Sequence, residues 1–165
     1  MPSILFVCTA NRFRSPLAAA YFRKMLKERR DESAISWVVG SAGTWTTPGQ
    51  PVLQAVSITA QKFGVDLADH RSISVSRQLL SKNDLILVMQ AGQREALQSE
   101  FSFLYERIYL LTTVAGLGSY DIPDSFESVQ DVVEISTELY TIIQGGWRQI
   151  CDLAIALHKQ QNTSS

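Results

Sequence analysis

The chain has 165 residues, which is enough for one domain with a substantial core. Hydrophobic residues make up 45% and charged residues 19% of it, and this balance excludes a disordered or fibrous chain. The formal net charge of −1 provides no global basic field for nucleic acid or an anionic membrane, and no apolar stretch reaches the roughly 18 to 20 residues that span a bilayer.

The first predicted elements are a strand and a helix. Residues 3–8 (SILFVC) form a nearly continuous apolar run, which is typical of a strand buried on both faces. Residues 15–30 predict a helix, with Ser15 at the N-cap and Pro16 at the first helical position.

The same alternation continues through the middle of the chain. Further strands are predicted within residues 35–43, 84–89 and 107–111, and further helices within residues 50–64, 76–83 and 91–100. Gly64 ends the first of these helices. Strands that alternate with helices predict an α/β fold: a single three-layer domain with a four-stranded parallel sheet and helices on both faces.

The last part of the chain predicts a loop and a long helix. Residues 112–126 are rich in turn residues and are expected to form a long loop. From Val129 to residue 154 the apolar positions follow the i, i+3, i+4 rhythm of an amphipathic helix, which Gly145-Gly146 would kink or break. The domain is expected to span residues 1–158 and to be followed by a frayed polar tail, residues 159–165.

The two cysteines, Cys8 and Cys151, lie far apart and suggest no disulfide framework. The short apolar run before Cys8 has no basic residue ahead of it, unlike a signal peptide, so we expect a reduced, intracellular protein in the cytoplasm. Cys151 lies on the apolar stripe of the predicted last helix and is expected to fill the core.

The segment CTANRFRS, residues 8–15, follows the first strand at the carboxyl edge of the sheet, where ligands bind in such folds. Its amides precede a helix and can converge on a tetrahedral oxyanion, with the positive end of the helix dipole behind them. Arg14 adds a planar fork for two phosphate oxygens, and Cys8 would lie beneath the phosphate as a thiolate nucleophile. The loop lacks glycine, so Asn11 is expected to supply a positive-φ position.

Taken singly, these residues have simpler explanations. Cys8 alone fits an inert buried thiol, and Arg14 alone fits a solvated surface arginine. Their spacing, with Ser15 and Pro16 directly after, favours the catalytic interpretation. The chain has no NTPase phosphate-loop pattern.

The run from Cys8 to Pro16 resembles the active-site signature C-x5-R-[ST] of the low-molecular-weight protein tyrosine phosphatases. The segments SAG (41–43), GVDLADHRS (64–72), DLILVM (84–89) and DIPD (121–124) follow in the family's order and spacing. The resemblance covers nearly the whole chain. It implies a phosphate-binding loop after the first strand and a reaction that needs neither a metal nor a cofactor.

The resemblance also implies catalytic roles. Cys8 would form a phosphocysteine intermediate and Arg14 would clamp the equatorial phosphate oxygens. Asp124 would protonate the leaving oxygen and then activate water, although Asp121 is a rival acid and Asp124 also fits an ordinary turn residue after Pro123.

Other matching residues would support this reaction. Ser15 would hydrogen-bond the thiolate, and Asn11 would be held in a strained conformation by a network with Ser41 and His70, two residues that also fit ordinary structural roles. The phosphate would be bound by the loop residues Thr9, Ala10, Asn11, Arg12, Phe13, Arg14 and Ser15.

The chain departs from the family pattern at several positions. Ser125-Phe126 replaces the usual proline and the tyrosine that often follows it, Gln90 replaces an acidic residue of many members, and Phe13 replaces a second cysteine that could shield the nucleophile as a disulfide. Arg12 stands where an apolar residue is common; it either points to solvent or attracts acidic substrates over a long range. Trp45 is either a pocket wall or a packed turn aromatic.

The expected activity is the hydrolysis of phosphomonoesters, with phosphotyrosine in proteins as substrate. Phosphoarginine and small aryl phosphates are alternatives that the sequence does not rank. Arsenate reduction requires more cysteines than Cys151 alone supplies, and a non-catalytic phosphate-binding module is a further alternative because of Ser125. The expected partner is a phosphorylated protein or an aryl phosphate, not nucleic acid or a membrane, and the oligomeric state is not predicted.

Overall fold

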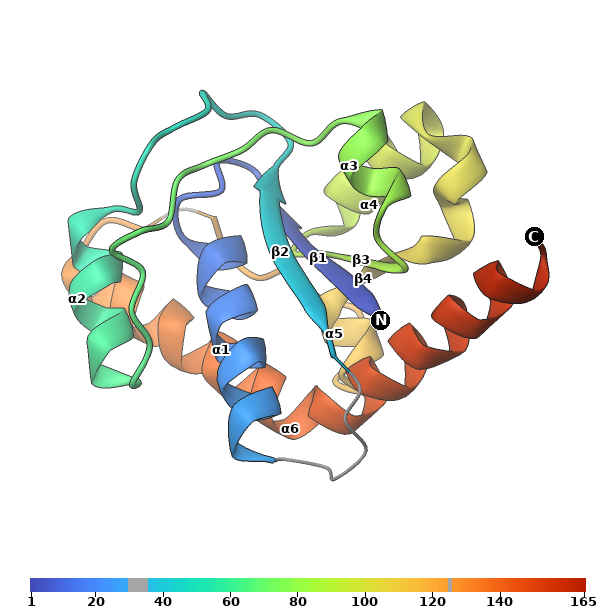
Figure 1. Ribbon diagram of the computed structural model, residues 1–165. Coiled ribbons are helices and arrows are strands. Elements are labelled where there is room, and N and C mark those ends of the chain that lie inside the picture. The colour runs from blue at the N-terminus through green and yellow to red at the C-terminus, as the bar shows by residue number, and fades with distance from the viewer. Residues whose placement is uncertain (30–35, 125) are drawn as a thin grey trace.

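The computed structural model describes residues 1–29, 36–124 and 126–165 (Figure 1). Strands and helices alternate along most of the chain. In order, the elements are β1 (Ser3–Cys8), α1 (Arg14–Glu28), β2 (Val38–Gly43), α2 (Gln54–Lys62), α3 (Arg77–Ser81), β3 (Leu85–Val88), α4 (Ala91–Glu100), the 3-10 helix η1 (Ser102–Arg107), β4 (Ile108–Leu110), α5 (Leu111–Val114) and α6 (Val129–Thr163).

The strands form one parallel sheet in the order β2-β1-β3-β4, with β1 in its interior. Along β1, Ser3 pairs with Val38 of β2, and Cys8 pairs with Gly43. The carboxyl ends of β1 and β2 therefore lie side by side, and the loop after Cys8 emerges at that edge. The predicted α/β fold with a four-stranded parallel sheet is confirmed.

Both faces of the sheet are covered by helices, because alternate side chains of each strand point to opposite sides. From β1, Ile4 and Phe6 point into the larger core, with side chains of α1, α2 and α6, whereas Leu5 and Val7 point into a second core with side chains of α3, α4 and η1. Figure 1 shows α1 and α2 on the side of the sheet away from α3 and α4. Each fully buried side chain of this size stabilises the fold by about 1.5–3 kcal/mol.

Helix α1 begins one residue earlier than predicted, and the predicted N-cap is wrong. Phe13 is the N-cap residue, and Pro16 lies at the third helical position. Proline is tolerated there because the first N–H groups of a helix have no acceptor within the helix, so the N–H that proline lacks costs no hydrogen bond. Ser15 directs its hydroxyl toward the sulfur of Cys8 instead of capping the helix. The ends of the predicted helix at residue 30 and of the predicted strand at residue 35 lie outside the described residues.

Two short helical segments were not predicted. The helix α5 occupies the start of the segment that was expected to be entirely loop, and η1 lies between α4 and β4. Each spans one or two turns, which is too short for a hydrophobic period to be recognised in the sequence.

Helix α6 runs through Gly145 and Gly146 without interruption, so the expected break is wrong, but the helix bends near its middle, as the expected kink requires (Figure 1). A Cβ added at Gly146 would lie 2.5 Å from Cβ of Ala115, just after α5. This glycine therefore allows close packing of the two segments. The segment expected to be a frayed tail is helical as far as Thr163, and Val129, expected on the apolar stripe, is 66% exposed.

Among the described residues, no helix is both long and apolar enough to span a membrane.

Candidate active site

Cys8 lies at the carboxyl end of β1 and Ser15 in the first turn of α1. The sulfur of Cys8 is 2.9 Å from Oγ of Ser15, and both residues are buried. Oγ of Ser15 also accepts a hydrogen bond of 2.8 Å from Nδ2 of Asn11, so its own proton remains to be shared between the sulfur and the more distant carbonyl of Ala42, at 3.3 Å. The serine hydroxyl is therefore placed to donate to a thiolate.

Asn11 supports the loop between these two residues. Its φ of 56° lies in the left-handed region, as predicted, and it is the only non-glycine residue of the described chain with positive φ. Its Nδ2 donates to Oγ of Ser15 at 2.8 Å and of Ser41 at 3.0 Å, and its Oδ1 accepts from the backbone N–H of Ile73 at 2.9 Å. These bonds hold a conformation that would otherwise be strained.

His70 holds the same loop from the outside. Its Nε2 lies 2.7 Å from the carbonyl oxygen of Asn11, and because a carbonyl can only accept, Nε2 carries the proton. Burial lowers the pKa of His70, the positive charges of Arg23 and Arg71 lower it further, and the hydrogen bond to Asn11 partly opposes these effects. A neutral imidazole that donates from Nε2 fits this position.

Gly43, at the end of β2, allows the loop to approach the sheet closely. A Cβ added there would lie 2.6 Å from the backbone oxygen of Thr9. The amides of the next two residues, Thr44 and Trp45, donate to the carbonyls of Cys8 and Thr9, both at 2.9 Å. The sequence placed Gly43 in a family segment but gave no reason for it, since the contact joins residues far apart in the chain.

Arg14 is 1% exposed, so the alternative of a solvated surface arginine is wrong. Its Nη1 donates to the carbonyl of Ile122 at 2.9 Å, its Nη2 donates to Oγ1 of Thr9 at 3.3 Å, and Nη2 also lies 2.7 Å from Oδ1 of Asp124. Oγ1 of Thr9 in turn accepts from Nε2 of Gln93, at 3.0 Å. The guanidinium is thus fixed by two segments, the loop after β1 and residues 122–124.

The two candidate acids have different environments. Asp124 is paired with Arg14 while its side chain remains 53% exposed. Asp121 instead accepts a 2.8 Å hydrogen bond from the backbone N–H of Ala91, the first residue of α4. Asp124 is therefore the carboxylate that reaches the arginine and the cysteine loop. Position 125, where the departure from the family pattern begins, lies outside the described residues.

These groups meet in a pocket of about 160 Å³, which suits the tip of a side chain rather than a whole cofactor. Phe13 and Phe126 form an aromatic wall, with their ring centroids 5.6 Å apart and their planes at 86°. The pocket is lined by Cys8, Ala10, Arg12, Phe13, Arg14, Leu53, Asp124 and Phe126.

Three positions near the pocket were left open or unassigned by the sequence. Nε of Arg12 donates to the carbonyl of Pro51 at 2.8 Å, which keeps its charge at the rim of the pocket. Trp45 is 85% exposed and does not line the pocket, so neither expectation for it is met. Gln93 had no predicted role, although it pairs with Gln90 as a capping box at the start of α4 and reaches the loop through Thr9. Its only signal in the sequence is the Gln-x-x-Gln spacing.

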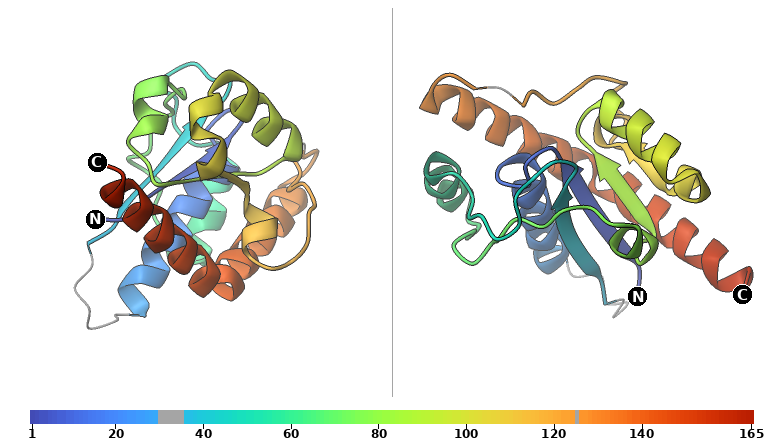
Figure 2. Two further views of the ribbon diagram at one scale, coloured as in Figure 1. Left: turned by 90° about the vertical axis from the view of Figure 1, so that its right-hand side faces the viewer. Right: turned by 90° about the horizontal axis from the view of Figure 1, so that it is seen from above.

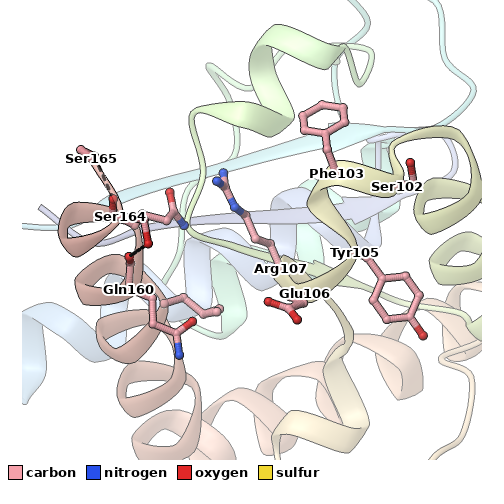
Figure 3. A pocket seen from close by; sticks show the side chains of 10 residues that line it. Ser102, Phe103, Tyr105, Glu106, Arg107, Gln160, Ser164 and Ser165 are labelled. Carbon is pink, nitrogen blue, oxygen red and sulfur yellow. Dashed lines mark hydrogen bonds between the residues drawn. The ribbon is translucent and has the colours of Figure 1, made fainter.

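Other candidate sites are separate from this pocket. A larger pocket of about 710 Å³ lies between η1 and the end of α6, lined by residues such as Phe103, Arg107 and Gln160, and it includes none of the predicted site residues (Figure 3). Cys151 is buried as predicted, and burial, with a smaller contribution from Asp152, raises the pKa of its thiol to about 12. Within the described ranges, no group of three or more His, Cys, Asp or Glu side chains is placed to hold a metal ion.

Known proteins resemble this chain in both sequence and structure. Residues 3–162 match the family model described as low molecular weight phosphotyrosine protein phosphatase. A probable low molecular weight protein-tyrosine-phosphatase, EpsP of Ralstonia nicotianae, is 31% identical over 83% of this chain and 87% of its own length. A protein-arginine-phosphatase of Bacillus subtilis is 29% identical over 78% of this chain and 83% of its own length. The fold matches the crystal structure of a YwlE mutant from Bacillus subtilis with a TM-score of 0.82 and 23% identity, covering 91% of this chain and 99% of that one.

Proposed function

The chain belongs to the low molecular weight phosphotyrosine protein phosphatase family and is a phosphatase, and on that premise we propose that it hydrolyses phosphotyrosine in proteins through a phosphocysteine intermediate on Cys8. The observation that carries this proposal is the convergence of the Cys8 sulfur, the Arg14 guanidinium and the Asp124 carboxylate in one pocket with an aromatic wall.

In the first step, the thiolate of Cys8 attacks phosphorus, forming a sulfur–phosphorus bond as the bond from phosphorus to the tyrosine oxygen breaks. Asp124, entering this step as the carboxylic acid, gives its proton to the departing oxygen. The short Cys8–Ser15 contact of 2.9 Å supports the sulfur as nucleophile, because a donated hydroxyl proton stabilises a thiolate.

In the second step, the carboxylate of Asp124 takes a proton from water while the water oxygen attacks phosphorus. The sulfur–phosphorus bond breaks, inorganic phosphate leaves, and the Cys8 thiolate is restored. Arg14 neutralises charge on the transferring phosphoryl group in both steps, because its planar fork matches two phosphate oxygens. Its fixation by Ile122 and Thr9 supports this role, since little reorientation is then required.

The walls of the pocket favour an aryl substrate. Phe13, Phe126 and Leu53 present aromatic and aliphatic surface, against which a flat phenyl ring packs well. Arg12 places a positive charge at the rim, and this charge repels the cationic guanidinium of phosphoarginine while it can attract acidic groups around a phosphotyrosine. A serine side chain is too short to bring its phosphate to the floor of the pocket.

Phosphoarginine is the second candidate substrate, because the Bacillus subtilis relative is named a protein-arginine-phosphatase. The choice is tested by kcat/KM for phosphotyrosine, phosphoarginine and phosphoserine in one peptide sequence. We expect phosphotyrosine to be the best substrate. In Arg12→Ala, we expect the ratio of kcat/KM for phosphotyrosine to kcat/KM for phosphoarginine to be smaller than in the unmodified enzyme. A higher kcat/KM for phosphoarginine in the unmodified enzyme would overturn the substrate assignment.

The nucleophile is tested separately with p-nitrophenyl phosphate. Cys8→Ser is expected to lose turnover and still bind orthovanadate, since the loop amides and Arg14 remain. Turnover retained in this variant would exclude Cys8 as the nucleophile. No turnover by the wild-type protein would favour a binding module.

A further inference from the structure

Another concave site lies behind the segment that carries the proposed acid. In the right-hand view of Figure 2, the chain after α5 runs back alongside the first half of α6 before that helix begins. Leu117 and Tyr120 of this segment, with Val133 and Ile142 of α6, line a pocket of about 430 Å³, which we call the α6 pocket. Its volume lies within the range of roughly 300–1,000 Å³ of small-molecule sites.

The α6 pocket exposes apolar surface that the fold does not use. Leu117 is 52% and Tyr120 is 39% exposed, although both side chains border a cavity. Val133, which is partly buried, adds aliphatic surface from the helix side, whereas Ile142 is only 1% exposed. An apolar or aromatic group that fills this space would remove that surface from water, which is the main favourable contribution to binding at such sites.

The charged side chains that line the α6 pocket are both negative. Glu134 and Glu138 lie one turn apart on α6, and the other lining residues carry no charge. Glu138 is partly buried, and Tyr120 lies in its field: burial, followed by the negative charge of Glu138, raises the pKa of Tyr120. The electrostatic field in the pocket therefore favours a cation and disfavours an anion.

We propose that the α6 pocket binds a small organic cation with an apolar or aromatic body. The body packs between Leu117, Tyr120 and α6, and the cationic group lies near the carboxylates of Glu134 and Glu138. A cation above the face of Tyr120 gains further attraction from the ring. The site shares no lining residue with the Cys8 pocket, so binding does not depend on the catalytic proposal.

Tryptamine is a suitable probe, because it joins an aromatic ring to one ammonium group. The experiment is a titration of 15N-labelled protein followed by amide chemical shifts, with indole-3-propionate as a control of similar ring and opposite charge. We expect saturable shifts at amides near Leu117, Tyr120 and the first half of α6 with tryptamine, and none at these amides with the control.

Three variants make the test specific. In Glu134→Gln/Glu138→Gln, both carboxylates are neutralised at constant shape, and tryptamine is expected to bind about fivefold more weakly, as expected for two partly exposed charge pairs. Thr137→Arg, at an exposed position on the pocket wall, is expected to abolish the shifts by adding bulk and positive charge. Cys8→Ser is expected to bind as the wild type does.

The proposal is wrong if indole-3-propionate binds as well as tryptamine or if the double glutamine variant binds tryptamine with unchanged affinity. It is equally wrong if the tryptamine shifts centre on Phe13 and Phe126 of the Cys8 pocket. Matched urea unfolding curves of the variants and the wild type exclude a general loss of structure as the cause of weaker binding.

Discussion

The replacement Asn11→Ala tests how the loop after β1 is held in place. It removes two hydrogen bonds donated by Nδ2, to Ser15 and Ser41, and one accepted by Oδ1, from Ile73. Three such bonds in a buried position contribute about 0.5–1.5 kcal/mol each. Alanine also tolerates the φ of 56° poorly, at a cost of about 1–2 kcal/mol. Together these terms lower the free energy of unfolding by about 2.5–6.5 kcal/mol.

The assay combines urea unfolding with turnover of p-nitrophenyl phosphate. We expect kcat of Asn11→Ala to fall by about 100-fold, since a displaced loop misplaces the amides and Arg14 by a fraction of an ångström or more. The matched control is Asn11→Gly, which loses the same three bonds but adopts positive φ freely, and it is expected to be the less damaged of the two. If Asn11→Ala lowers the free energy of unfolding by less than about 1 kcal/mol and leaves kcat unchanged, this account of the loop is refuted.

Three further predictions follow from other contacts. Gly43→Ala places a Cβ 2.6 Å from the backbone oxygen of Thr9, so the free energy of unfolding is expected to fall by about 1–3 kcal/mol and turnover is expected to decrease. A variant with the stability and the turnover of the wild type would contradict this prediction. Because the pKa of Cys151 is raised to about 12 by burial, Ellman's reagent is expected to label only Cys8 rapidly in the folded enzyme, so fast labelling of Cys8→Ser would be contrary to expectation. Because the pKa of His70 is lowered in the folded protein, the unfolded chain binds a proton on this residue first as the pH falls; the stabilisation is therefore complete above about pH 6.5 and is lost as the pH falls through the pKa of the folded state. In His70→Gln, the free energy of unfolding is expected to fall less steeply between neutral and acidic pH, and an unchanged pH dependence would exclude this linkage.

Local signals explain why much of the fold was predictable. The apolar run of β1 and the alternation of strands with helices depend on neighbouring residues, so they are visible in the sequence. The positive φ of Asn11 was predicted for the same kind of reason, because a loop without glycine that must bend around an anion favours asparagine at such a position.

Features that depend on distant segments were not predictable in the same way. Ser15 has the residue type and position of an N-cap, yet its hydroxyl contacts the Cys8 sulfur because the loop folds back over β1. The glycine at position 146 suggested a kink, but its close packing against Ala115, a residue distant in the chain, has no signal in the sequence. The fixation of Arg14 by Ile122, 108 residues later in the chain, likewise has no local signature.

The consequences of the departures from the family pattern could be seen only in the structure. Phe126 was of uncertain consequence in the sequence, and the structure places its ring against Phe13 at the pocket. Asp121 and Asp124 are equivalent as residue types; the family resemblance favoured Asp124, and the contacts of Asp121 with α4 and of Asp124 with Arg14 distinguish them in space.

The central claim, a covalent phosphoryl group on Cys8, is tested most directly in Asp124→Ala with p-nitrophenyl phosphate. This substrate has a good leaving group that needs little protonation, so attack by Cys8 proceeds while hydrolysis of the intermediate, which lacks its base, is slow. We predict a rapid burst of one equivalent of p-nitrophenol, followed by slow turnover, and a denaturing quench during the burst that yields one phosphoryl group on the peptide containing Cys8. Turnover without a burst, or a phosphoryl group on any other residue, would contradict the account.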